Sequence, residues 1–125
     1  MKVKTSELIG PALDWAVAKA EGYDEGWLAR QMGNPNPHTR AIPAFSTDWS
    51  QGGPIIEREF ISISPGEWDV DATPMVQNIC AWSLKAEIHG TEKFYYGPTP
   101  LVAAMRCFIS SKIGDEVDVP EELSN

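Results

Sequence analysis

Residues 97–114 read GPTPLVAAMRCFISSKIG, and this stretch predicts the helix around which the rest of the chain is organised. Thr99 is a good N-cap, because its hydroxyl can accept a hydrogen bond from an unpaired amide of the first turn. Pro100 then occupies the first helical position, where its missing N–H costs nothing, and Gly114 favours the end of the helix. Apolar residues recur at helical spacing and predict one buried face: Leu101, Ala104, Met105, Phe108 and Ile109.

The chain has 125 residues, of which 42% are hydrophobic and 22% are charged. These values are typical of one soluble globular domain, so we treat residues 1–125 as a single domain. The formal net charge is −8. Such a surface repels phosphate backbones, so we expect no direct binding to nucleic acid. The same acidity would also suit a protein that imitates nucleic acid.

The two cysteines, Cys80 and Cys107, follow no metal-binding spacing. We interpret both as reduced thiols and expect neither a metal nor another cofactor. Met1-Lys2-Val3-Lys4 is not followed by the apolar segment of a signal peptide. No apolar run approaches the length of about 20 residues that spans a bilayer. These features predict a protein of the cytoplasm that does not enter a membrane.

A helix is predicted near the N-terminus, where Gly10-Pro11 places proline at the first helical position. Its buried stripe consists of Leu13, Ala16, Val17 and Ala20. Trp15 lies off the centre of this stripe, so it either flanks the core or faces a pocket.

The least regular part is residues 22–45, which proline, glycine and asparagine punctuate. We expect a long surface loop there, with a single short helical turn at Trp27–Met32. A short helix is expected from about Asp48 to Glu59, since Asp48 is a good N-cap. Gly52-Gly53-Pro54 weakens this prediction, and the alternative is a loop that runs into a strand at Ile55.

Three strands are predicted in the second half of the chain. Residues 61–64 and 67–72 alternate in polarity around the turn Pro65-Gly66, so we expect a hairpin. Residues 79–89 alternate over a longer run and place Cys80 and Trp82 on the apolar face. A sheet with one apolar face is typically antiparallel and is covered by helices on that face.

The predicted fold class is therefore α+β. We expect a two-layer sandwich, in which two main helices and a short glycine-containing helix cover a three-stranded antiparallel sheet. An acidic tail follows over residues 115–125. We expect its Val117 and Val119 to pack on the core.

Five blocks of the sequence, taken in order, resemble the NinX-like family of phage and prophage proteins. The blocks are Met1–Leu8, Ala12–Lys19, Ser46–Glu57, Gly97–Cys107 and Gly114–Leu123. Residues 22–44 and 65–95 stand outside the resemblance, and Gly10-Pro11 departs from the family's usual first helix start. Ser46–Asp48 more loosely resembles a family of small phage α/β sandwich domains. Neither family has an established activity, so the resemblance implies a phage accessory protein of the bacterial cytoplasm, and no chemistry.

Two stretches are candidates for a ligand site. The helix start at Thr99 offers amides and the positive end of a helix dipole, which suit an anion. Residues 46–53 offer two glycines that let a ligand approach the backbone, and a tryptophan that could stack on a base. The candidate ligand-binding residues are Asp48, Trp49, Gln51, Gly52, Gly53, Thr99 and Arg106.

Simpler interpretations compete at each of these positions. Thr99 would only cap its own helix, and Trp49 would be a core residue. Arg106, in the middle of the last helix and off its apolar face, would pair with Glu57 or Glu59. The ligand hypothesis gains if the two stretches lie side by side, because pockets form where polar groups converge on aromatic walls. The sequence has no hydrolase or metal motif, so we assign no catalytic residue.

The leading functional hypothesis is a non-enzymatic phage accessory protein that binds a small anionic, nucleotide-like ligand. Sequestration of a host defence signal would be one use of such binding. The alternative is an acidic interaction module, or nucleic-acid mimic, that inhibits a host enzyme and has a host protein as its partner. An enzyme that uses Asp48 with a bound nucleotide is a third hypothesis, and a homodimer is a further one.

Overall fold

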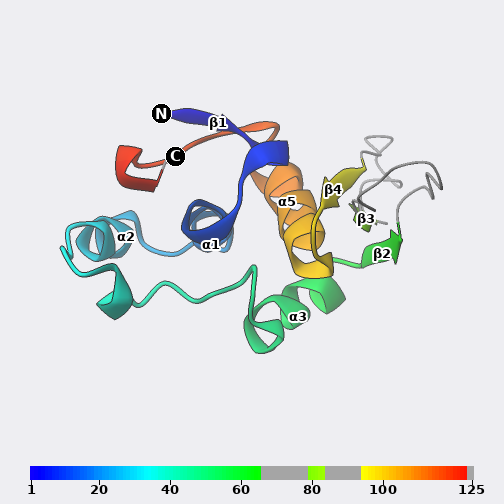
Figure 1. Ribbon diagram of the computed structural model, residues 1–125, viewed down its shortest axis with the longest axis horizontal. Coiled ribbons are helices and arrows are strands. Elements are labelled where there is room, and N and C mark those ends of the chain that lie inside the picture. The colour runs from blue at the N-terminus through cyan, green and yellow to red at the C-terminus, as the bar shows by residue number, and fades with distance from the viewer. Residues whose placement is uncertain (66–78, 84–93, 124–125) are drawn as a thin grey trace.

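The computed structural model describes residues 1–65, 79–83 and 94–123. This part of the chain forms four α-helices and two small antiparallel sheets (Figure 1). The helices are α1 (Gly10–Ala20), α2 (Glu25–Met32), α3 (Trp49–Arg58) and α5 (Pro100–Lys112). Short 3-10 turns occupy Thr5–Glu7, Pro37–Thr39 and Glu121–Leu123. The predicted α+β class is confirmed, whereas the two-layer sandwich stays a prediction.

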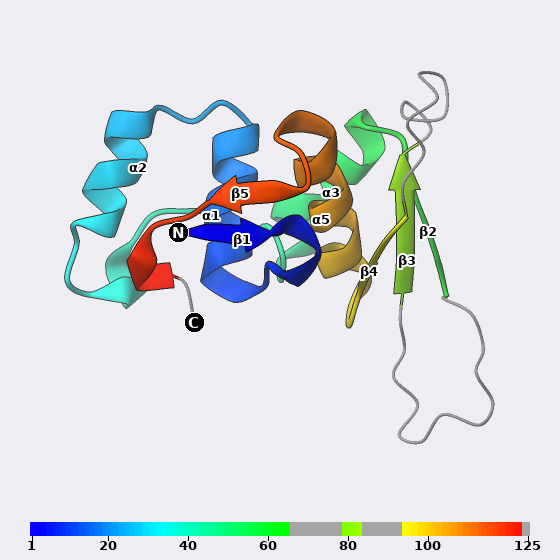
Figure 2. The same ribbon diagram turned by 90° about the horizontal axis from the view of Figure 1, so that it is seen from above.

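Helix α5 begins as predicted and lies at the centre of the molecule. The Thr99 hydroxyl accepts a hydrogen bond from the Val102 amide at 3.2 Å, and Gly114 ends the helix with a φ of +125°. The prediction of one buried face is too narrow, because every residue from Leu101 to Ile109 is buried. Figures 1 and 2 both place α5 between α1 and the larger sheet, so protein covers it on opposite sides.

The larger sheet has the strand order β2 (Ile61–Pro65), β3 (Ile79–Ser83) and β4 (Tyr95–Gly97), and both pairings are antiparallel. The predicted strand at 67–72 and the end of the predicted run 79–89 lie outside the described residues. The hairpin at Pro65-Gly66 therefore stays a prediction. Strand β4 was missed, because Tyr-Tyr-Gly is too short to show an alternation of polarity.

The two faces of β3 are the reverse of the prediction. Ala81 and Ser83 are almost fully buried on the face that packs on α5, whereas Cys80 and Trp82 lie on the opposite face. The reason is the close approach of helix and sheet. A Cβ on Gly97 in β4 would lie only 2.8 Å from a backbone nitrogen of α5. Small side chains therefore face the helix, and the large tryptophan ring is placed on the other side.

A second sheet, absent from the prediction, joins the two ends of the chain. Strand β1 (Lys2–Lys4) pairs with β5 (Glu116–Asp118), and Val3 lies opposite Val117 (Figure 2). Val117 and Val119 are 1% and 2% exposed, so their predicted packing on the core is confirmed. Three residues of β1 are too few to show a strand pattern, and their partner lies more than 100 positions away.

The helices of the first half confirm two predictions and correct one. Helices α1 and α3 form where they were expected, and the alternative of a strand at Ile55 is wrong, since Ile55 is buried within α3. Helix α2 has eight residues and is longer than the single turn predicted for Trp27–Met32. Its N-cap is Asp24, whose carboxylate accepts a hydrogen bond from the Trp27 amide at 2.9 Å. The surrounding glycines and prolines hid this cap in the sequence.

We predict that Gly52→Ala destabilises the fold. A Cβ at this position would lie 2.4 Å from the carbonyl oxygen of Phe45 and 2.7 Å from Cδ2 of Leu101. Backbone cannot move aside cheaply, so the free energy of unfolding should fall by about 1–3 kcal/mol in urea denaturation.

The matched control is Gly53→Ala, where the nearest atom to a Cβ is a Trp49 ring carbon at 3.9 Å. Alanine loses less conformational entropy than glycine when a helix forms. The free energy of unfolding of this variant should therefore rise by about 0.5–1 kcal/mol. Equal effects of the two substitutions would contradict the tight contact at Gly52.

Candidate functional site

The structure brings the two predicted ligand-binding stretches together. Gly52 in the first half of α3 packs against the Leu101 side chain in the first turn of α5, and the two helices are in contact. Figure 1 shows α3 in green beneath the yellow start of α5. We use the name helix-start corner for the start of α3 together with the start of α5, and its residues are Asp48, Trp49, Gln51, Gly53 and Thr99.

Asp48 and Thr99 act as N-caps of their helices. The Asp48 carboxylate accepts hydrogen bonds from the amide and the hydroxyl of Ser50, at 2.9 and 2.7 Å. These bonds lower the pKa of Asp48, so its carboxylate is charged at neutral pH. Thr99 is a neutral cap. The starts of α3 and α5 therefore differ in charge: a carboxylate offsets the positive dipole end of α3, but not that of α5.

Trp49 and Gln51 are exposed at the helix-start corner, and Trp49 has 54% of its surface accessible. The alternative that Trp49 is a core residue is therefore wrong. Gly52 is buried, and its missing side chain accommodates Phe45 and Leu101 of the same chain. Gly53 is half-buried beside the Trp49 ring. Of the two glycines, only Gly53 is therefore accessible to a ligand.

Arg106 donates hydrogen bonds to the backbone of two other segments. Its Nε donates to the Leu8 carbonyl at 2.8 Å and its Nη1 to the Tyr96 carbonyl at 2.7 Å. The predicted pairing with Glu57 or Glu59 is wrong, because these backbone oxygens are its partners. Burial lowers the pKa of the Arg106 guanidinium, although arginine stays protonated at neutral pH. We conclude that Arg106 has a structural role.

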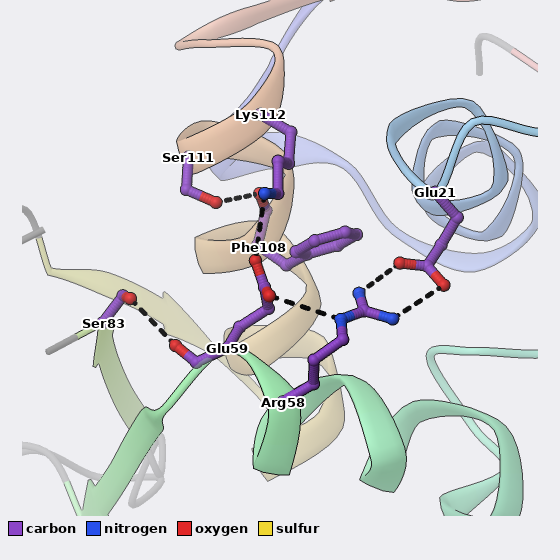
Figure 3. A network of polar contacts seen from close by, with 7 residues as sticks. All are labelled: Glu21, Arg58, Glu59, Ser83, Phe108, Ser111 and Lys112. Carbon is purple, nitrogen blue, oxygen red and sulfur yellow. Dashed lines mark hydrogen bonds and ion pairs between the residues drawn. The ribbon is translucent and has the colours of Figure 1, made fainter. Parts of the chain in front are cut away.

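Glu59 pairs instead with two other cations, Arg58 and Lys112, at the end of α3 (Figure 3). Its carboxylate is 3.3 Å from Nε of Arg58 and 3.2 Å from Nζ of Lys112 at the end of α5. Arg58 also pairs with Glu21 at the end of α1, and its pKa is raised chiefly by that hydrogen bond. The Ser83 hydroxyl donates to the Glu59 backbone carbonyl at 3.1 Å. This network joins the ends of three helices to β3, and the sequence did not predict it.

A cleft that the sequence also did not predict lies between α1, α2 and the C-terminal segment. Its volume is about 450 Å³. Apolar residues and charged residues both line it, among them Trp15, Leu28, Met32, Lys19, Glu25 and Glu122. Both alternatives given for Trp15 hold, because it belongs to the core and also lines this cleft. The other walls were missed because residues 22–45 were interpreted as a long loop with only a single helical turn at Trp27–Met32.

We predict that Arg106→Met lowers the free energy of unfolding by about 2–5 kcal/mol, because two backbone carbonyls would lose their charged donor. Methionine keeps the length of the side chain, so lost packing contributes little. Urea denaturation measures the change. Arg30→Met, an exposed substitution on α2, is the control and should change stability by less than about 0.5 kcal/mol. A similar value for both variants would rule out the structural role of Arg106.

Glu59→Gln should lower the free energy of unfolding by about 1–3 kcal/mol, since a nearly buried carboxylate that pairs with two cations would be neutralised. The control is the exposed neighbour Glu57→Gln, for which we expect a change below about 0.5 kcal/mol. Thermal and urea unfolding measure both variants. If the two glutamines have the same effect, the network does not stabilise the helix ends.

Within the described residues, no group of three or more His, Cys, Asp and Glu side chains could hold a metal ion. No helix in that part of the chain is long and apolar enough to cross a membrane. A search of curated proteins finds no match to this sequence. A family model described as Bacteriophage P22, NinX matches residues 4–112, a range that includes the whole helix-start corner and most of the chain. The chain therefore belongs to the NinX family of phage proteins.

Proposed function

We propose that this phage protein binds a small anionic, nucleotide-like ligand at the helix-start corner and does so without catalysis. The observation that carries the proposal is Trp49, which is 54% exposed where two helix starts meet. A large aromatic ring on a surface is a ready stacking partner for a base. In this proposal the protein acts in the cytoplasm of the host bacterium.

The charges of the helix-start corner orient the ligand. The Asp48 carboxylate at the start of α3 repels an anion, whereas the start of α5 has the neutral cap Thr99 and a positive dipole end. We therefore place the phosphate at α5 and the base on Trp49. The exposed amide of Gln51 would donate to, or accept from, the edge of the base or a ribose hydroxyl.

Binding is favoured over catalysis by the chemistry of these groups. Stacking, a helix dipole and a side-chain amide hold a ligand but do not move protons. The Asp48 carboxylate accepts two hydrogen bonds from Ser50 and has a lowered pKa, so it is a weak base at neutral pH. Sequestration of a signalling nucleotide made by a host defence system would need no more than this.

The alternative, an acidic module that imitates nucleic acid, fits the described surface less well. Lys2 lies opposite Asp118 and Lys4 opposite Glu116 in the sheet of the two chain ends. Positive charges thus lie beside two acids of the tail, Glu116 and Asp118. A mimic needs a continuous row of negative charge, spaced like phosphates.

We predict that Trp49→Ala weakens nucleotide binding at least tenfold, because stacking on an aromatic side chain contributes about 1–3 kcal/mol per base. The full chain would be titrated calorimetrically with mononucleotides and cyclic dinucleotides. Native mass spectrometry of protein from infected cells would show any ligand that is retained, together with the oligomer mass.

The control is Phe60→Ala, which removes an aromatic side chain of similar exposure, 59%, at the other end of α3. This variant should bind as the unaltered protein does. The proposal fails if no nucleotide binds in either assay, or if Phe60→Ala and Trp49→Ala weaken binding equally.

A further inference from the structure

We infer that the cleft between α1, α2 and the C-terminal segment is a second ligand site, and that its ligand is an aromatic zwitterion. The ligand class is a small molecule with one flat ring, one ammonium group and one carboxylate, as in aromatic amino acids. Residues of α1 and α2 line the cleft. Figure 2 shows α2 on the far side of α1 from α3 and α5, whose starts make up the helix-start corner. The two proposed sites can therefore be tested independently of each other.

The size and walls of the cleft fit one aromatic ring with a short polar tail. Its volume of about 450 Å³ is within the range of small-molecule pockets. Trp15 from α1 and Leu28 from α2 are 9% and 2% exposed, so the wall they form is held in place by the core. Met32, which adapts its shape to a ring, lies one turn beyond Leu28.

The charges of the cleft select the ligand's polar groups. Lys19 supplies one cation, and Glu25 and Glu122 supply two carboxylates from different segments of the chain. A polyanion such as a nucleoside triphosphate would meet two like charges and only one opposite charge. An ammonium group pairs with the glutamates and a carboxylate with Lys19, so a zwitterion satisfies both signs.

The Lys19 ammonium already occupies the place where a ligand ring would lie. Its Nζ is 5.3 Å from the centroid of the Trp15 ring, a weak cation–π contact. A ring that enters the cleft would replace this ammonium over Trp15. Lys19 would then be released to pair with the ligand's carboxylate, so one movement creates both contacts.

The test is isothermal titration of the full chain with L-tryptophan and L-phenylalanine. Tryptamine, which has no carboxylate, and indole-3-propionate, which has no ammonium, are the comparison ligands. We expect saturable binding of the amino acids and at least tenfold weaker binding of both comparison ligands, because each loses a charge-assisted hydrogen bond. Absence of saturable amino-acid binding, or equal affinity for all four compounds, would overturn the inference.

Three variants test whether the amino acid binds in the cleft. Ala29→Trp fills the cleft from α2 without removing a core side chain, and it should reduce the affinity for L-tryptophan at least tenfold. Arg30→Trp adds the same ring to the same helix at an exposed position outside the cleft lining and should bind normally. Trp49→Ala should also bind the amino acid normally. Loss of amino-acid binding in Trp49→Ala, with retention in Ala29→Trp, would place the ligand elsewhere and refute the cleft.

Discussion

One buried guanidinium joins the N-terminal segment and the larger sheet to the central helix. Arg106 donates to the carbonyl of Leu8, 98 residues earlier, and to that of Tyr96. Backbone carbonyls that lose water need a partner, and a helix surface offers none except its side chains. Arginine supplies several donors in a fixed planar arrangement. Helix α5 can therefore be buried on nearly every side, while the backbone carbonyls of the segments that cross it still receive hydrogen bonds.

Local signals predicted the helices whose ends are capped in the ordinary way. Thr99-Pro100 and Asp48 are recognisable from neighbouring residues alone, because a cap acts on the first turn of its own helix. The faces of β3 could not be predicted, since they depend on how closely α5 approaches the sheet. The β1–β5 pairing and the partners of Arg106 depend on residues about 100 positions apart, which no local pattern records.

The candidate site was predicted in part, for the same reason. The neutral cap at Thr99 follows from local sequence, whereas the sequence left open whether Trp49 is exposed or lies in the core. The structure decides that Trp49 is exposed, and the closeness of the two stretches follows from the Gly52 contact with Leu101. Gly52 itself looked like an opening for a ligand, but it serves packing between two helices. The 450 Å³ cleft was missed because three separate segments form it, and each segment alone resembles an ordinary amphipathic or acidic stretch.

The sheet made from the two ends of the chain has a consequence for synthesis. Strand β1 leaves the ribosome before its partner β5, which follows more than 100 residues later. Until β5 is made, Val3 has no partner strand. Helix α1 likewise cannot pack against α5 until α5 has been synthesised. Long-range contacts of this kind close late. A nascent chain cut short before α5 would therefore leave the apolar face of α1 exposed, and exposed apolar surface favours aggregation.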